Sequence, residues 1–277
     1  MTSAYRGRNR YRTFLKAGRT IAGRIAALDG TVGVLGTGAI GRRFGDRFSD
    51  LDLVVYARTD AVRAISRLVS VGWIRYRGMD FDIVVESYER ACKAGSPSIY
   101  RSQVRRWDVQ NSQILHDTDD RVKDLLQAKL VYPDSERRSM MARYQQEVHE
   151  YLVFFPELWA ERGQLYNVVD ALHRAVQSMV LWIYAKNKVF EPYIPKRLFW
   201  HCETETVPEH VYLTRLTEIH TTGLRSIAAA MRAREKLLRV CEEIGLTFEV
   251  NGFDEARVRA LRNWKRTDDA TRRILAW

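Results

Sequence analysis

The feature that most constrains the fold is a glycine-rich loop between two apolar segments in the first quarter of the chain. Glycines, arginines and a pair of aspartates make up the loop and its exit: Gly36, Gly38, Gly41, Gly45, Arg42, Arg43, Arg47, Asp50 and Asp52. Glycine lets a backbone turn tightly and approach a ligand closely, and arginine suits phosphate groups. The apolar segments on either side, residues 31–35 and 51–56, predict two buried strands joined by this loop.

The loop belongs to neither of the two best-known glycine-rich phosphate motifs. No Gly-Lys-Ser/Thr follows the glycines, so the segment is not a P-loop. Gly36, Gly38 and Gly41 have GxGxxG spacing, but no helix is predicted to open from them in the dinucleotide-binding manner, so we do not interpret them as that fingerprint. Its meaning must therefore come from the residues into which it leads.

Carboxylates on two predicted strands supply candidate metal ligands. Asp50 and Asp52 are two residues apart, so on a strand they point to the same face and can share a cation. A later apolar segment, residues 81–85, carries Asp82, which we expect to be the third ligand because an unpaired carboxylate would be costly to bury there. Asp80 lies on the same face and is the alternative third ligand. Mg²⁺ prefers such hard oxygen ligands.

Helices and strands alternate irregularly over the first 120 residues. The pattern predicts helices at 10–28 and 59–71 and strands at 31–35, 51–56, 72–76, 81–85 and 113–116, the last at a sheet edge. Such a mixture indicates an α+β domain with a mixed sheet flanked by helices. We therefore predict a first domain over residues 1–120.

From residue 121 onward the sequence predicts helices alone. The clearest covers 166–186, where apolar residues recur every three or four positions. Other helices are expected at 137–151, ending before Pro156, at 209–220, at 225–245 and at 254–275. Residues 121–277 are therefore predicted to form an all-helical second domain, and Asp170 and Arg174 within it have the spacing of an intrahelical ion pair.

Composition and charge indicate the possible partners and the cellular location of the protein. The net charge is +11, and seven Lys and Arg residues precede the first acidic residue, Asp29. This basic arm is either a contact for phosphates, including RNA, or a solvated helix face. No apolar stretch is long enough to span a membrane, and no signal-peptide core opens the chain, so a cytoplasmic location is expected. Three widely spaced cysteines suggest a reducing compartment.

Taken together, these residues resemble a known family. Gly36 and Thr37, then the Ser49-Asp50-Leu51-Asp52 segment, then Asp82 on a later strand follow the order found in the polymerase-β-like nucleotidyltransferase superfamily. The segment Ile114–Asp119 and the helical second half are similar to its antibiotic nucleotidyltransferase branch, which acts on aminoglycosides or lincosamides. Thr37 stands where that family usually has serine and keeps the hydroxyl group.

The resemblance implies a role for each matching residue. Gly36, Thr37 and Ser49 would bind the nucleotide, and one of Arg42 and Arg43 would contact phosphate. Asp50, Asp52 and Asp82 would be catalytic and hold two Mg²⁺ ions. Lys196 is a further candidate for the triphosphate tail.

The activity implied is transfer of a nucleoside monophosphate, most simply AMP from ATP, to a hydroxyl acceptor with release of pyrophosphate. A small molecule is the first expectation for the acceptor, although the net positive charge disfavours polycationic aminoglycosides. A nucleic-acid or protein acceptor is the alternative within the same chemistry. A non-catalytic module that binds nucleotides or nucleic acid is the alternative in another class.

Overall fold

The computed structural model describes residues 8–69, 72–76, 79–93, 103–192, 202 and 207–248, with the backbone alone described at 72–76. The chain divides into two compact units. The first comprises Met1–Pro133 and Val189–Trp200, and the second comprises Asp134–Lys188 and His201–Trp277. The predicted domain division between residues 120 and 121 stays a prediction. The predicted helix at 254–275 lies outside the described residues.

The first unit is built on a five-stranded mixed sheet with the order β3-β4-β2-β1-β5. Its strands are β1 (Thr31–Gly36), β2 (Leu51–Ala57), β3 (Gly72–Tyr76), β4 (Met79–Ser87) and β5 (Gln113–Asp117). β2 and β4 run parallel, while the other neighbours are antiparallel. The predicted α+β class is confirmed, and β5 lies at an edge of the sheet as expected.

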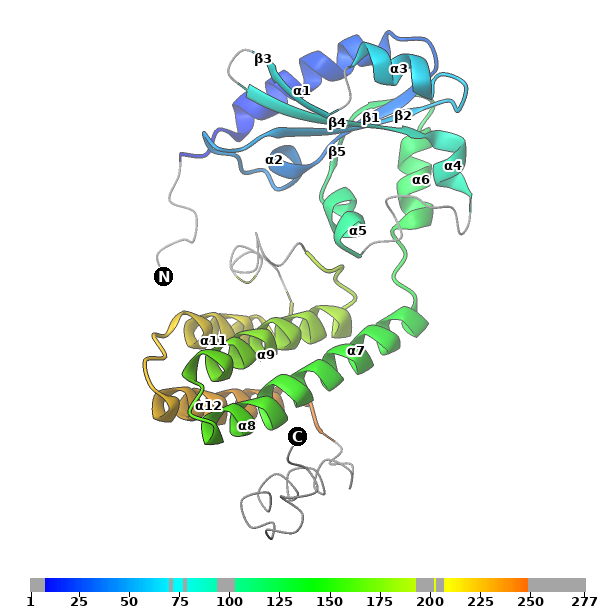
Figure 1. Ribbon diagram of the computed structural model, residues 1–277. Coiled ribbons are helices and arrows are strands. Elements are labelled where there is room, and N and C mark those ends of the chain that lie inside the picture. Colours follow the sequence, from blue (N-terminus) through cyan, green and yellow to red (C-terminus); the bar gives the residue numbers. More distant parts are fainter. Residues whose placement is uncertain are drawn as a thin grey trace, which may run out of the picture. The chain divides into compact units, whose positions relative to one another are not determined.

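Helices cover both faces of this sheet (Figure 1). The helices of the first unit are α1 (Tyr11–Ala26), α2 (Gly38–Gly41), α3 (Val62–Leu68), α4 (Tyr88–Cys92), α5 (Gln103–Gln110) and α6 (Arg121–Lys129). Phe14 and Ile25 of α1 and Ile65 of α3 pack in one core with the alternate β2 residues Leu51 and Leu53. α4, α5 and α6 supply the core on the opposite face, which Val54 and Tyr56 of β2 share. The side chain of Asp52 therefore belongs to the second face, because side chains alternate along a strand.

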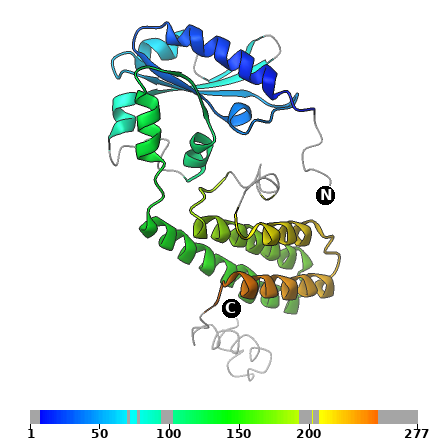
Figure 2. The same ribbon diagram turned by 180° about the vertical axis from the view of Figure 1, so that it is seen from behind.

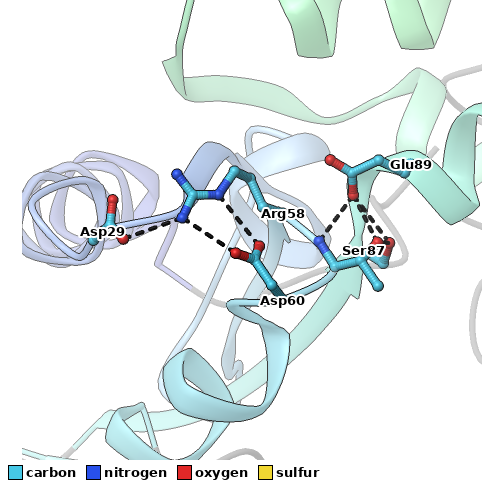
Figure 3. Close-up of polar contacts among 6 residues, drawn as sticks. Asp29, Arg58, Asp60, Ser87 and Glu89 are labelled. Atoms are coloured by element: carbon cyan, nitrogen blue, oxygen red, sulfur yellow. Dashed lines mark hydrogen bonds and ion pairs between the residues drawn. The ribbon is translucent and has the colours of Figure 1, made fainter.

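An ion-pair network fixes the carboxyl end of β2, at the opposite end of the strand from Asp52 (Figure 3). Arg58 follows β2 directly, and its guanidinium contacts Asp29 after α1 at 3.1 Å and Asp60 at 3.3 Å. The hydrogen bond from Arg58 lowers the pKa of the Asp60 carboxyl below its ordinary value. These three side chains tie the end of α1 to the end of the strand.

A second group of polar contacts joins the same end of β2 to α4 (Figure 3). Glu89 accepts hydrogen bonds from the backbone N–H of Thr59 at 2.9 Å and from its hydroxyl at 2.8 Å. Ser87 caps α4 by accepting from the backbone N–H of Arg90. Burial opposes ionisation of Glu89, but the hydrogen bonds from Thr59, Ser87 and the backbone together outweigh it, and the pKa of Glu89 is lowered. Both groups therefore stabilise the sheet where its two parallel strands end.

The described residues of the second unit form helices and the turns between them, as predicted. It contains α7 (Asp134–Val148), a π-helical segment η2 (His149–Phe154), α8 (Phe155–Glu161), α9 (Leu165–Lys186), α11 (His210–Thr221) and α12 (Ile227–Ile244), which are coloured from green to orange in Figure 2. α9 contacts each of the others and buries Leu172, Val176, Met179 and Ile183 among them. Arg174 and Asp170 form the expected intrahelical pair at 2.8 Å. None of the helices described in the chain is long and apolar enough to cross a membrane.

One helix boundary differs from the prediction. The helical path does not stop before Pro156, because the π-helical segment ends at Phe154 and α8 begins at Phe155. Pro156 thus lies in the first turn of α8, where a missing N–H costs no intrahelical hydrogen bond. The change from a π-helix to an α-helix allows the helical path to continue through Pro156.

Candidate active site on the parallel strands

The central relationship of the candidate site is the pairing of β2 with β4. Their parallel register places Asp52 beside Asp82. Both side chains are half-buried, and Phe81 and Ile83 on either side of Asp82 point into the opposite core. The local cause is period-two alternation, which turns the aspartates to one face and the apolar residues to the other.

The other two carboxylates lie at the start of the same strand pair. The register of β2 with β4 begins with Leu51 beside Phe81, so Asp50 and Asp80 directly precede it, one on each strand. Asp50 is half-buried, and so is Asp80. Asp80 therefore stays the alternative third ligand. Within the described residues, no group of three or more His, Cys, Asp or Glu side chains is arranged as a metal-ion site.

The backbone of the glycine loop lies directly against Asp52. The backbone N–H of Thr37 donates to the carbonyl of Asp52 at 3.0 Å, and Gly36 is the register partner of Leu53. Gly38 has φ +51°, and a Cβ built on it would lie 1.5 Å from Oδ2 of Asp52. Only glycine fits here, because a side chain would occupy the position of the carboxylate. The loop thus forms a cradle around Asp52.

The carboxylate oxygens of this site are suitable ligands for a metal ion. Asp52 and Asp82 offer carboxylate oxygens from adjacent strands, and the strand pair holds their Cα atoms in fixed register. Hard oxygen donors of this kind suit Mg²⁺, which binds proteins through one or two carboxylates and keeps several waters. The residues present therefore fit the metal that the sequence resemblance implies.

The remaining predicted nucleotide ligands occupy different positions around the loop. Thr37 is buried at the start of α2, and its side chain makes no capping hydrogen bond there. Arg42 is half-buried, whereas Arg43 is exposed with φ +54°, a conformation unusual for arginine. The hydroxyl of Ser49 donates to Asp46 at 3.1 Å and closes a turn before Asp50. Lys196 lies outside the described residues. All these nucleotide-binding roles stay predictions.

Two residues that position the loop were not predicted from the sequence. The side chain of Asn9 donates to the carbonyl of Arg43 at 3.1 Å and accepts from the backbone N–H of Gly45 at 3.3 Å. The amide of Gln113 on β5 donates to the hydroxyl of Tyr11 at 2.8 Å and to the carbonyl of Ile40 at 3.0 Å. No local sequence signal marks either residue, because each contact joins segments far apart in the chain.

A known sequence family matches the middle of the chain. A family model described as a domain of unknown function, DUF4037, matches residues 102–197, about a third of the chain. No curated protein sequence matches the chain.

Two solved structures share similarity with the chain. A nucleotidyltransferase-like protein from Exiguobacterium sibiricum 255-15 is 18% identical over 82% of this chain and 75% of its own, with a TM-score of 0.41. The spectinomycin adenyltransferase AAD(9) from Enterococcus faecialis, crystallised with ATP and spectinomycin, is 10% identical over 82% of this chain and 98% of its own, with a TM-score of 0.35. Both names refer to nucleotidyl transfer, the class that the sequence resembles.

Proposed function

We propose that this protein is a nucleotidyltransferase that moves a nucleoside monophosphate, most simply AMP from ATP, onto a hydroxyl acceptor and releases pyrophosphate. The observation that carries the proposal is the register pairing of Asp52 with Asp82 beside the glycine loop. Two carboxylates on one sheet face next to a tight backbone turn suit a metal-bound triphosphate. The reaction class needs positioning and charge neutralisation more than covalent chemistry.

Each residue of the site has a proposed task. Asp50, Asp52 and Asp82 would hold the two Mg²⁺ ions, which when bound neutralise phosphate charge and polarise the reacting oxygens. Gly36 and Thr37 would support the triphosphate through the loop backbone. Asp82 would also accept the proton of the acceptor hydroxyl, and its place beside Asp52 supports that role.

The arginines of the loop would act on the charge of the leaving group. Arg43 is exposed, and its backbone is held by Asn9, so its side chain extends from a fixed position. Guanidinium groups bind phosphate through paired hydrogen bonds. We therefore propose that Arg43, together with the half-buried Arg42, neutralises pyrophosphate as it departs.

The test combines two products of one reaction. The protein, Mg²⁺ and each of the four α-³²P-labelled nucleoside triphosphates are incubated with a panel of hydroxyl acceptors: small antibiotics, RNA and protein. Transfer predicts equal amounts of labelled acceptor and pyrophosphate, and no signal from Asp52→Asn. Nucleotide binding without either product across the panel would favour the alternative, a non-catalytic nucleotide-binding module.

A further inference from the structure

Exposed cations lie at the start of the chain and along α1. We call this set the N-terminal basic stripe and define it as the exposed residues Arg8, Arg10, Arg12, Lys16, Arg19 and Arg24. No acidic residue occurs from position 8 to position 28. The buried face of the same helix, with Phe14, Ala22 and Ile25, packs on the sheet, so the cations face away from the core.

These cations are not used to hold the fold together. None of the six forms an ion pair with any residue that the structure describes. By contrast, Arg58, Arg174 and Arg215 each pair with a carboxylate on the chain itself. Unpaired like charges repel one another across a helix face, so the stripe is better suited to an anionic partner than to stability.

The length of the stripe indicates what kind of anion it fits. Arg12, Lys16 and Arg19 follow the i, i+4, i+7 spacing of one helix face. With a rise of 1.5 Å per residue, these three cations extend over about 10 Å, and Arg24 lies about 8 Å further along the axis, about 120° around the helix from Arg12. A single triphosphate is too short to contact them all, whereas a nucleic-acid strand carries a phosphate about every 3.4 Å of its axis.

The stripe begins beside the glycine loop that also contacts Asp52, whereas α1 itself covers the sheet face opposite to the Asp52 and Asp82 side chains. The backbone N–H of Arg10 donates to the carbonyl of Gly45 at 2.6 Å, and Asn9 holds Arg43 and Gly45 of the same loop. A pocket of about 550 Å³ is lined at this point by the described residues 8–13. That volume lies within the range of pockets that take small ligands.

The aromatic residues of α1 do not offer a platform for stacked bases. Phe14 is buried, and Tyr11 is half-buried with its hydroxyl bonded to Gln113. Recognition through phosphates alone fixes position on a strand and does not read sequence. The partner is therefore expected to be bound by its backbone.

We propose that the N-terminal basic stripe binds the phosphodiester backbone of single-stranded RNA, whatever its sequence, and presents an RNA hydroxyl to the Asp52–Asp82 site as the acceptor. RNA fits because each of its sugars carries a 2′-hydroxyl beside the phosphates that the stripe contacts. The acceptor role rests on the proposed function, whereas the binding role does not. In the transfer step, the RNA hydroxyl oxygen bonds to the α-phosphorus, and the bond from that phosphorus to the β-phosphate oxygen breaks. Pyrophosphate leaves, and the hydroxyl proton goes to the Asp82 carboxylate.

A matched pair of variants of the full chain tests the binding role. The stripe variant removes three cations of the stripe and carries Arg12→Gln, Lys16→Gln and Arg19→Gln. The control variant removes the same residue types at the same spacing from the exposed face of α12 and carries Arg232→Gln, Lys236→Gln and Arg239→Gln. The second set is the control because acidic residues, including Glu235 and Glu242, lie among its cations. Binding of a fluorescein-labelled, roughly 20-nucleotide RNA is measured by anisotropy at about 50 and 200 mM salt.

The stripe variant should lose roughly 10- to 100-fold in RNA affinity, and its logarithmic salt slope should fall by about 2, as expected for three lost phosphate contacts. The control variant should bind like the unmodified protein, and both should keep its melting temperature. Unchanged affinity in the stripe variant, or an equal loss in the control, overturns the proposal. Tighter binding of the same-sequence DNA or of polyglutamate overturns the assignment of RNA.

Transfer measurements separate this proposal from the proposed function. With α-³²P-labelled ATP, labelled RNA that depends on both the stripe and Asp52 supports the whole proposal. Label on a small acceptor but none on bound RNA overturns the acceptor role while nucleotidyl transfer stands. Stripe-dependent RNA binding without transfer to any acceptor contradicts the proposed function and supports the binding role alone.

Discussion

Asp52 and Asp82 lie side by side on adjacent parallel strands, although thirty residues separate them in the chain. Each is flanked along its strand by residues buried in the opposite core, so neither carboxylate can turn away from the shared face without breaking the alternation of its strand. The sheet therefore fixes the distance between the two strands at these residues, about 4.8 Å. This relationship makes the first prediction possible.

Asp52→Asn and Asp82→Asn should each reduce nucleotidyl transfer by roughly 10²- to 10⁴-fold, because each removes a carboxylate that would hold Mg²⁺ and neutral amides bind it weakly. The measure is labelled-acceptor formation, with the melting temperature as the check that the fold is kept. Asp80→Asn is the comparison on the same strand face. If Asp80→Asn abolishes transfer while Asp82→Asn is active, Asp80 and not Asp82 is the third ligand.

The second prediction concerns the backbone that cradles Asp52. Gly38→Ala should lower transfer at least about tenfold with only about 1–2 kcal/mol of lost stability, because the new Cβ overlaps Oδ2 of Asp52 and the carboxylate must move. Gly163→Ala is the matched control: Gly163 also has positive φ, at +71°, but a Cβ there meets nothing within 4 Å. It should lose similar stability and keep full activity. Equal activity of the two variants would contradict the cradle.

Much of the first unit follows from local patterns in the sequence. β2 and β4 are predicted because apolar and β-branched residues alternate with aspartates, and the same alternation places Asp82 opposite Phe81 and Ile83. Helix α5, in contrast, was not predicted: its sequence is mostly polar, yet Arg106 and Trp107 are buried by contacts with distant parts of the unit. Tertiary burial overrides composition there.

The details of the site depend on information that local sequence does not carry. The register of β2 against β4 is a pairing between distant segments, and alternation alone allows shifts by two residues. The positive φ of Gly38 depends on how the loop packs against Asp52, and the hydrogen bonds of Asn9 and Gln113 join residues 34 to 102 positions apart. The aspartates could be chosen from the sequence, but their partners could not.

The third prediction concerns a partly buried ion pair in the second unit. Glu209, before α11, contacts Lys186 of α9 at 2.8 Å and accepts from Asn187 at 2.7 Å. Burial opposes its ionisation, but the hydrogen bonds from Lys186 and Asn187 outweigh that cost, and the pKa of Glu209 is lowered. Glu209→Gln should therefore cost about 1–2 kcal/mol in urea unfolding at pH 7.

The pH dependence of this contribution follows from the sign of the shift. A carboxyl with a lowered pKa stabilises the fold above its unfolded value of 4.5, and the gain disappears as pH falls through the folded pKa. The variant and the unmodified protein should thus converge in acid. Glu243→Gln, which breaks the exposed pair of Glu243 with Arg215, is the control and should leave the urea midpoint unchanged. A larger effect from Glu243→Gln would mean that burial does not decide the strength of these pairs.

The last prediction concerns a histidine pair between α9 and α11. The rings of His173 and His220 lie 4.2 Å apart, and burial, together with the charge of His173, lowers the pKa of His220 from 6.5 to about 4. Because the unfolded chain binds the proton more readily, stability is fully present above pH 6.5 and is lost as pH falls toward 4. The loss should be about 1–2 kcal/mol, reduced from the full shift because the ring is partly exposed to solvent. Urea unfolding between pH 7 and 4 measures it. His220→Gln should remove most of this dependence, whereas His210→Gln, at an exposed position of the same helix, should retain it. An unchanged pH profile in His220→Gln would mean that other groups govern the acid sensitivity of the helical unit.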